Sequence, residues 1–137
     1  MTTYELKVVG RVESSLKDPA DAPRQADEGA PEAWLVFDRE MLPALDGTRP
    51  GSEAILITWL DRASRDVLQN HPRRDPSRPM QGVFSTRSPN RPNPIGLHRV
   101  HILAVEGERV HVRALEAVDG TPIVDMKTVL HEDIALR

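Results

Sequence analysis

Residues 87–94 carry the polar side chains that best fit a binding site. Their sequence is RSPNRPNP, with prolines at positions 89, 92 and 94. Each proline fixes its own φ angle and restricts the residue before it, so the stretch is expected to form a stiff loop. Two arginines and two asparagines on a rigid frame can hold a ligand at low entropic cost. The alternative is a rigid surface connector with solvated arginines.

A second polar segment, residues 119–127, has the sequence DGTPIVDMK. The Asp-Gly pair predicts a tight hairpin, because such a turn needs a positive φ angle that glycine tolerates. On the strand that follows, Ile123, Asp125 and Lys127 are expected to share one face. If the other face packs into the core, Asp125 and Lys127 lie together outside or at the mouth of a barrel. The alternative is an exposed ion pair that contributes little to stability.

Several other chemistries lack the residues that they need. The chain has no cysteine, which excludes disulfides, thiolate zinc sites, iron–sulfur clusters and cysteine nucleophiles. It has neither a Gly-x-Gly pair nor a Gly-Lys-Ser/Thr string, so the Rossmann fingerprint and the P-loop are absent. His98 and His101 are three residues apart on an expected strand, hence on opposite faces, and no metal site is expected. No Gly-x-Ser-x-Gly elbow is present, although a Ser-His-Asp triad stays open.

Positive charge is concentrated around the first polar segment. The whole chain has 18 basic and 21 acidic residues, a net charge of -3. Residues 67–105 hold six arginines and a single acidic residue, Asp75. Arginine grips phosphate and carboxylate groups with paired donors, so this segment can meet an anion. The alternative is that these arginines pair with the acidic loop between Glu13 and Glu32.

Length and composition predict one folded domain, residues 1–137. Hydrophobic residues make up 39% and charged residues 28% of the 137, as in ordinary globular proteins. No stretch approaches the roughly 18 consecutive apolar residues of a membrane span. The N-terminus lacks a basic-then-apolar signal pattern, so a cytoplasmic location without membrane partners is expected.

Short alternating segments predict an all-β, mainly antiparallel fold. Asp38 is expected to cap a short helix through Leu45, and residues 14–32 and 71–80 to form loops. Closing the sheet avoids exposed edges, which favours a small single-sheet β-barrel with one or two short helices. The expected strands are residues 4–13, 33–37, 53–60, 81–86, 95–105, 110–118 and 123–128.

The polar segments, taken with their flanks, resemble a known family. Residues 82–96 (GVFSTRSPNRPNPIG) and 119–127 are similar to the motifs of the TsaA-like (TrmO) family, and residues 23–25 match a further family element. The resemblance runs from Tyr4 to about Leu130. It implies an S-adenosylmethionine-dependent methyltransferase that acts on N6 of the threonylcarbamoyl-modified adenosine beside the tRNA anticodon. It also implies a single-sheet barrel, usually a homodimer with the cofactor near the interface.

Roles can be given to individual residues of this implied site. On chemical grounds, Asp125, a carboxylate next to apolar surface, is the candidate base for the amine proton, and an arginine can pair with the methionine carboxylate. Arg24, Gln25 and Lys127 are implied to contact the substrate. The implied cofactor pocket comprises Phe84, Ser85, Arg87, Ser88, Arg91, Asn93, Pro94 and Ile95 on one side and Asp119, Gly120, Thr121 and Pro122 on the other.

Two departures from the family pattern keep other functions open. Thr128 and Val129 stand where relatives often have Pro-Tyr, which removes an aromatic surface that can stack on a base. The chain ends at Arg137, without the C-terminal extension of longer bacterial members. A small or non-tRNA substrate therefore stays possible. Further alternatives are a non-catalytic module that binds S-adenosylmethionine or a related nucleoside as a sensor or interaction domain, and a structural barrel whose proline-rich loop contacts another protein.

Overall fold

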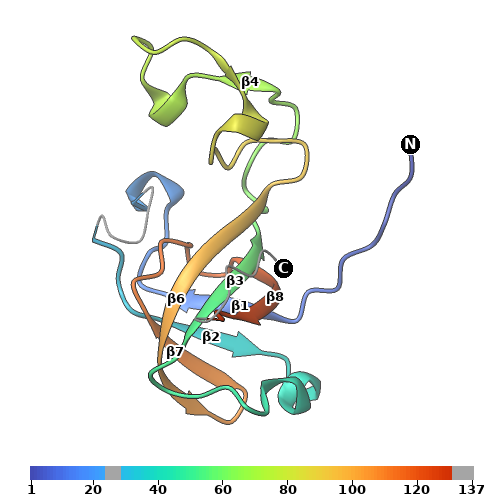
Figure 1. Ribbon diagram of the computed structural model, residues 1–137, viewed down its shortest axis with the longest axis vertical. Coiled ribbons are helices and arrows are strands. Elements are labelled where there is room, and N and C mark those ends of the chain that lie inside the picture. The colour runs from blue at the N-terminus through green and yellow to red at the C-terminus, as the bar shows by residue number, and fades with distance from the viewer. Residues whose placement is uncertain (24–28, 131–137) are drawn as a thin grey trace.

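Alternating inward and outward side chains build a closed barrel of six antiparallel strands (Figure 1). The computed structural model describes residues 1–23 and 29–130. Neighbouring strands follow the order β1-β2-β7-β6-β3-β8, and β8 pairs with β1 to close the sheet. The expected all-β barrel is therefore confirmed. Its strands are β1 (Gly10–Ser14), β2 (Ala33–Phe37), β3 (Glu53–Trp59), β6 (Ile95–Glu106), β7 (Arg109–Arg113) and β8 (Pro122–Thr128).

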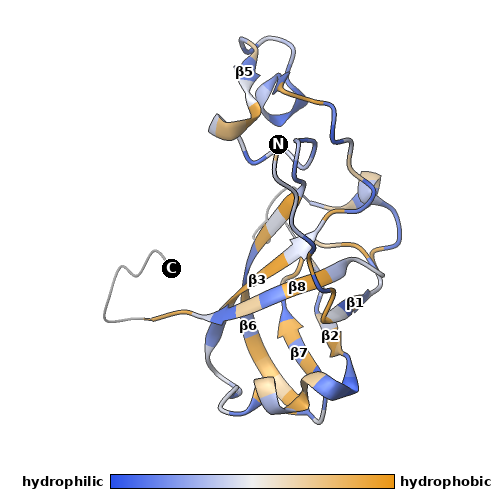
Figure 2. Cartoon of the chain, turned by 90° about the vertical axis from the view of Figure 1, so that its right-hand side faces the viewer, coloured by the Kyte–Doolittle hydropathy of each residue, from blue (hydrophilic) through white to orange (hydrophobic). Residues whose placement is uncertain are grey.

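Apolar side chains fill the barrel interior. Along β3, for example, Ala54, Leu56 and Thr58 are buried while the residues between them are partly exposed. This two-residue period brings one side chain in every two into the core. Hydrophobic and hydrophilic residues accordingly alternate along the strands in Figure 2. The fully buried side chains include Leu35, Leu56, Leu115, Ile123, Val100, Val110 and Val112.

The helices of the described residues are short 3-10 turns. The expected helix after Asp38 is present as η3 (Arg39–Leu45). The expected side-chain cap is wrong, because the Asp38 backbone carbonyl, not its carboxylate, accepts the Met41 N–H at 2.8 Å. The others are η1 (Pro19–Asp21), η4 (Pro72–Arg74) and η5 (Val83–Ser85), and none of the helices found is long and apolar enough to cross a membrane.

The first strand begins at Gly10 rather than Tyr4, so that prediction is wrong over residues 4–9. Beside Gly10, the Val9 N–H still donates to the Ile123 carbonyl at 2.8 Å, and the Val9 carbonyl accepts the Asp38 N–H at 2.8 Å. Residues 1–8 are exposed and leave the barrel (Figure 1). On its other edge β8 has a bulge, because Thr58 pairs with Ile123 but Ile57 with Asp125, which leaves an extra residue in β8.

The connection from β3 to β6, residues 60–94, forms a lobe beyond one end of the barrel (Figure 1). Within this upper lobe, β4 (Gln69–Asn70) pairs with β5 (Gln81–Gly82). The strand expected over residues 81–86 is wrong beyond Gly82, where η5 follows. The Val83 carbonyl accepts the Thr86 N–H at 3.1 Å, which closes a turn instead of extending the ladder.

The connection from β7 to β8 crosses the same end of the barrel. The expected strand over residues 110–118 ends at Arg113, because Ala114 has a φ of 60°. Gly120 has the expected positive φ of 83°. The expected hairpin is nevertheless wrong, since β7 pairs with β2 and β6 whereas β8 pairs with β1 and β3.

Candidate functional site

The two polar motifs meet at the lobe end of the barrel. Thr58, near the end of β3, pairs with Gly96 of the first motif on one side and with Ile123 of the second motif on the other. Neighbouring strands lie about 4.8 Å apart, so the beginnings of β6 and β8 are separated by roughly 10 Å. One ligand of nucleoside size can therefore reach both motifs.

Arg91 holds the loop of the first motif in shape. Its Nε donates to the Ser88 carbonyl at 2.7 Å, and its Nη2 donates to the carbonyls of Val83 (2.8 Å) and Thr86 (2.6 Å). These bonds connect η5 to the proline-rich stretch. Because its guanidinium binds loop carbonyls, Arg91 serves as a framework for the site.

Arg65 and Ser64 attach the same loop to the end of β3. Arg65 donates to the Pro92 carbonyl at 2.7 Å and to Asn93 Oδ1 at 3.0 Å, and its guanidinium lies 5.1 Å from the ring centroid of Trp59. The Ser64 N–H donates to Asn90 Oδ1 at 2.9 Å. Sequence analysis missed Arg65, because residues 61–69 have no clear periodicity. The side-chain oxygens of both asparagines of the motif thus accept hydrogen bonds from residues of the same lobe.

Other side chains of the first motif face outward. Phe84 is 87% exposed, and Ser85, Arg87 and Ile95 are also exposed. The described residues offer the Arg87 guanidinium neither a hydrogen bond nor an ion pair. Pro94 is fully buried. The predicted pocket residues therefore divide into a framework and an exposed set that can contact a ligand.

The start of the second motif is bonded to β1. The Asp119 carboxylate accepts the Ser14 N–H at 3.0 Å and pairs with Lys17 Nζ at 3.0 Å. The Gly120 N–H donates to the Val12 carbonyl at 2.7 Å, and Pro122 is opposite Arg11 in the sheet. The backbone of this turn is therefore fixed. Thr121, the remaining predicted residue of this turn, is buried and donates its hydroxyl to the Val118 carbonyl at 2.6 Å.

Asp119 gives the barrel an acid-dependent contribution to its stability. The Ser14 N–H, and next the Lys17 ammonium, hold the pKa of this carboxyl below its ordinary value. A carboxyl group whose pKa is lower in the folded state stabilises the protein at pH values above its unfolded-state pKa. This stabilisation is lost as the pH falls through the folded-state pKa. When the pH is lowered from 6 to 3, the urea concentration at the unfolding midpoint is expected to fall further for wild type than for Asp119→Asn. Equal losses in the two proteins would contradict this assignment.

Asp125 and Lys127 lie on the outer face of β8, as predicted. Asp125 Oδ2 is 3.4 Å from Lys127 Nζ, and both side chains are about half exposed (49% and 48%). Asp125 Oδ1 also accepts the Met126 N–H at 2.8 Å. The prediction that Ile123 shares this face is wrong, because the bulge turns Ile123 into the core. Arg24 and Gln25 lie outside the described residues.

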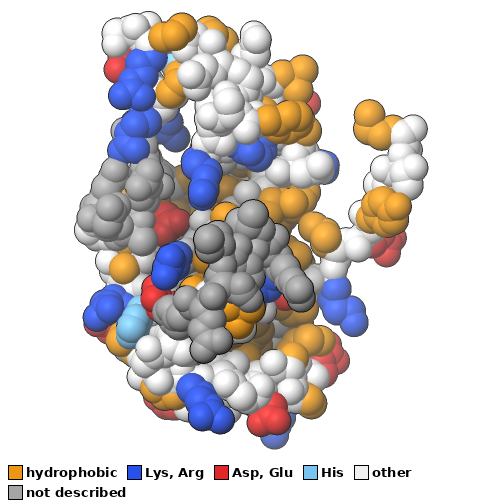
Figure 3. Space-filling model, viewed as in Figure 1, with side chains coloured by type: hydrophobic (Ala, Val, Ile, Leu, Met, Phe, Trp, Pro, Cys, Tyr) orange, Lys and Arg blue, Asp and Glu red, His pale blue; other side chains and the backbone are white. Residues whose placement is uncertain are grey.

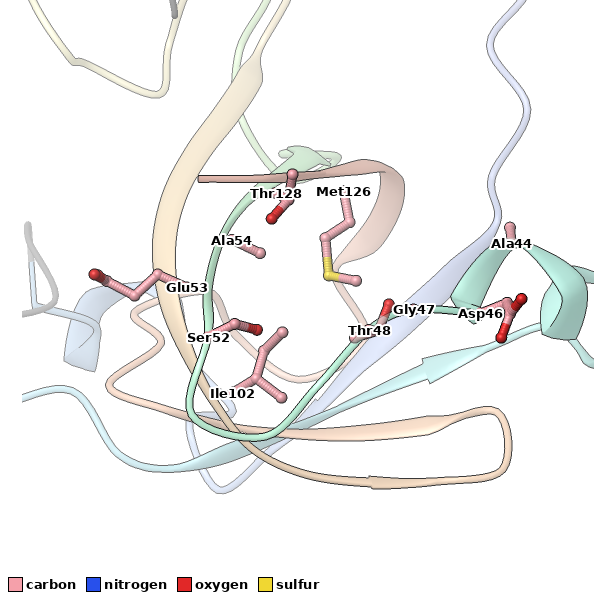
Figure 4. Close-up of a pocket in the computed structure, with 10 residues that line it drawn as sticks. All are labelled: Ala44, Asp46, Gly47, Thr48, Ser52, Glu53, Ala54, Ile102, Met126 and Thr128. Carbon is pink, nitrogen blue, oxygen red and sulfur yellow. The ribbon is translucent and has the colours of Figure 1, made fainter. Parts of the chain in front are cut away.

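Two cavities lie away from the first motif. The larger, about 320 Å³, opens between β3, β8 and the loop after η3, and Figure 4 shows Ala54, Ile102 and Met126 lining it. Ala54 is four residues before Thr58 on β3, so this cavity lies toward the opposite end of the barrel. The smaller, about 120 Å³, is lined in part by Asp125. Neither cavity is lined by a residue of 82–96.

Basic and hydrophobic side chains occupy different sides of the upper lobe. Figure 3 shows Lys and Arg on one side of the lobe and hydrophobic side chains on the other. Of the acidic loop, Glu13 pairs with Arg109 at 2.9 Å and Glu32 with His111 at 3.1 Å; these partners come from β7 and not from residues 67–105. Acidic positions 27 and 28 lie outside the described residues.

His98 and His101 lie on opposite faces of β6, as predicted. His98 is buried inside the barrel, whereas His101 is partly exposed on the opposite face of β6. Over residues 1–23 and 29–130, no three His, Asp or Glu side chains are grouped closely enough to hold a metal ion.

Residues 11–133 match the sequence model of the tRNA-methyltransferase O N-terminal domain. The chain belongs to this family. A relative from Methanothermobacter thermautotrophicus, named a probable S-adenosyl-L-methionine-binding protein, is 41% identical over 136 residues, which are 98% of this chain and 96% of that protein. The S-adenosyl-L-methionine-binding protein of Archaeoglobus fulgidus is 44% identical over 123 residues, 89% of this chain and 86% of that protein.

The tRNA-methyltransferase O N-terminal domain is also recognisable in the fold. A crystal structure of TrmO from Pseudomonas aeruginosa superposes with a TM-score of 0.76 at 26% sequence identity. The match covers 98% of this chain and 60% of that one. The chain therefore spans about three-fifths of the solved TrmO chain, while it spans most of the two archaeal relatives.

Proposed function

We propose that this chain binds S-adenosylmethionine between its two motifs and methylates N6 of threonylcarbamoyl-modified adenosine in tRNA. The observation that carries the proposal is the pairing of Thr58 with Gly96 and Ile123, which brings both motifs to one end of the barrel. Two archaeal relatives of similar length are named S-adenosyl-L-methionine-binding proteins, which supports the cofactor. A cytoplasmic reaction is part of this proposal.

Arg87 is the motif arginine suited to the methionine carboxylate. Arg91 already donates to three loop carbonyls, whereas Arg87 is exposed on the same loop. A guanidinium and a carboxylate form paired, charge-assisted hydrogen bonds. The framework formed by Arg65 and Arg91 would keep this arginine in place, so that little conformational entropy is lost on binding.

Asp125 is the candidate proton acceptor. When bound, the cofactor supplies an electrophilic methyl group on its sulfonium sulfur. The carboxylate of Asp125 would take the proton that the amine loses when its nitrogen receives the methyl group. Asp125 is half exposed on β8, within the second motif, and is therefore accessible to such a substrate. Alignment of the nitrogen with the methyl group supplies most of what positioning can contribute to the rate.

Removing the charge of Arg87 should weaken cofactor binding. Arg87→Met is expected to raise the dissociation constant for S-adenosylmethionine about 30-fold, because a hydrogen bond to a charged group contributes about 2 kcal/mol. Isothermal titration calorimetry measures this change. Arg78→Met, in the same lobe but paired with Asp75, is the control and should bind like wild type. Equal affinity of Arg87→Met and wild type would remove Arg87 from the site.

The exposed arginines of the upper lobe suit an RNA backbone. Arg74, Arg78 and Arg87 are exposed there, and the lobe presents its basic side chains together (Figure 3). RNA binding depends on neutralising phosphates and weakens as salt rises. The deciding experiment is transfer of labelled methyl groups to tRNA with and without the threonylcarbamoyl group. Cofactor binding without transfer to either tRNA would instead support the non-catalytic sensor module.

A second copy of the chain is proposed to complete the cofactor site. Ligand sites usually bury most of their ligand, whereas Phe84, Arg87 and Ile95 of the first motif are exposed in one chain. Apolar side chains are exposed along the same region, including Phe84 on η5 and Ile95 and Leu97 on β6. An apolar surface next to an incomplete site fits a homodimer whose interface adjoins the cofactor.

A charge on this apolar surface should separate the copies. Leu97 is 50% exposed, so Leu97→Glu can be tolerated by the isolated barrel. Sedimentation velocity is expected to show a dimer for wild type and a monomer for Leu97→Glu, with weaker cofactor binding. Leu42→Glu, at a similarly exposed leucine on η3, should remain dimeric. A wild-type monomer that binds the cofactor normally would contradict the shared site.

A further inference from the structure

A chain of buried polar side chains crosses the barrel interior beneath the two motifs. Thr58 Oγ1 is 2.7 Å from His98 Nε2, and His98 Nδ1 is hydrogen-bonded to Glu116 Oε1. Thr58 is completely buried, His98 is 6% exposed, and the Glu116 side chain is 16% exposed. These three residues come from β3, β6 and the β7–β8 connection, so the polar chain joins three separate segments.

Each member of this polar chain is adjacent to a motif. His98 is two residues after Gly96, the last residue of the first motif, and Glu116 is three residues before Asp119, the first residue of the second. Gly96 leaves room for these polar side chains, because a Cβ atom at position 96 would lie 2.3 Å from Thr58 Oγ1 and 2.7 Å from His98 Nε2. The polar chain therefore links the two segments whose relative placement matters for a shared ligand.

Stability alone does not account for these groups. Apolar side chains of similar volume usually stabilise a core as well as a buried ionisable pair does. Glu116 Oε2 is buried and has no hydrogen-bond partner among the described residues, which is unfavourable. The bonds are, however, directional: a neutral imidazole that donates from Nδ1 to the carboxylate must accept the threonine hydroxyl at Nε2. Such bonds define one relative placement of the connected segments.

We propose that His98 and Glu116 are positioning residues that hold the start of β6 and the β7–β8 connection in the arrangement that binds the cofactor. The proposal rests on the function proposed above, in which both motifs contact S-adenosylmethionine. Neither residue touches the ligand in this proposal. Both act through the backbone of the motifs, and His98 lies between Thr58 and Glu116 in the series of hydrogen bonds.

A triple variant separates positioning from stability. Thr58→Val, His98→Leu and Glu116→Met together replace every polar group of the chain with an apolar one of similar size. This variant is expected to keep its unfolding midpoint near that of wild type but to bind S-adenosylmethionine about tenfold more weakly. Hydrogen exchange without ligand should be faster at the amides of Asp119 and Gly120.

The matched control uses a second histidine–glutamate pair of the described residues. His111 and Glu32 are 3.1 Å apart on the barrel exterior and are not part of the buried polar chain, so His111→Leu with Glu32→Met should change neither affinity nor amide exchange. If the triple variant does not fold, Glu116→Gln replaces it, with weaker affinity at an unchanged midpoint expected.

The outcomes distinguish this proposal from the proposed function. A triple variant, or Glu116→Gln in its place, with wild-type affinity and wild-type amide exchange would overturn the positioning role while the function stands. A wild-type chain that bound no S-adenosylmethionine would overturn the function. Amide exchange at Asp119 and Gly120, measured without ligand, would then still decide whether the polar chain holds the motifs.

Discussion

Gly96→Ala is expected to destabilise the barrel by about 3 kcal/mol, at the upper end of what overpacking a core costs. The new methyl carbon would lie 2.3 Å from Thr58 Oγ1, 2.7 Å from His98 Nε2 and 3.2 Å from Leu60 Cδ2. Thr58 is flanked by β6 and β8, so it cannot move without disturbing both strands. Urea unfolding at neutral pH, followed by circular dichroism, measures the change.

The same motif provides the control for this substitution. Gly82 has an ordinary negative φ of -64°, and the atom nearest to an added Cβ would be the Leu68 carbonyl oxygen at 4.0 Å. Gly82→Ala is therefore expected to leave the unfolding midpoint almost unchanged. If both variants unfolded at the wild-type urea concentration, the tight contact between Gly96 and the polar chain would not exist in solution.

The barrel could be predicted because its information is local. The short apolar runs over residues 33–37 and 53–60 predict two strands from the sequence alone, and both are present as β2 and β3. The errors arise where one strand depends on another. The bulge in β8 turns Ile123 away from the face of Asp125. No pattern in residues 119–127 indicates that extra residue, since it is defined only by pairing with β3.

The residues of the candidate site could be predicted from the sequence. Which of them shape the loop and which can contact a ligand could not. Residues 87–94 were identified by their prolines, yet spacing could not tell that Arg91 binds loop carbonyls while Arg87 faces outward. The polar chain was missed because Thr58 and His98 are 40 residues apart, and His98 and Glu116 are 18 apart. A lone buried histidine on a strand is ordinary; only the fold brings its partners to it.

Arg91→Lys is expected to raise the dissociation constant for S-adenosylmethionine about 100-fold, although it keeps the charge. A single ammonium cannot replace the guanidinium donors that bind the carbonyls of Val83, Thr86 and Ser88. Losing about two hydrogen bonds from a charged donor corresponds to this change in affinity. Because the loop lies outside the barrel core, the unfolding midpoint should fall only slightly. Calorimetric titration and urea unfolding measure the two effects.

Comparing Arg91→Lys with Arg87→Lys tests whether Arg91 shapes the loop while Arg87 contacts the ligand. If Arg87 pairs with a carboxylate, lysine retains the attraction as a point charge, and its affinity should fall by several-fold only. Lysine at position 91 keeps the charge but loses the geometry, so it should be the more damaging of the two. The reverse order would mean that Arg91 meets the ligand directly and that its bonds to the loop break when the cofactor binds. Charge-conserving substitutions therefore decide which arginine shapes the loop and which one meets the anion.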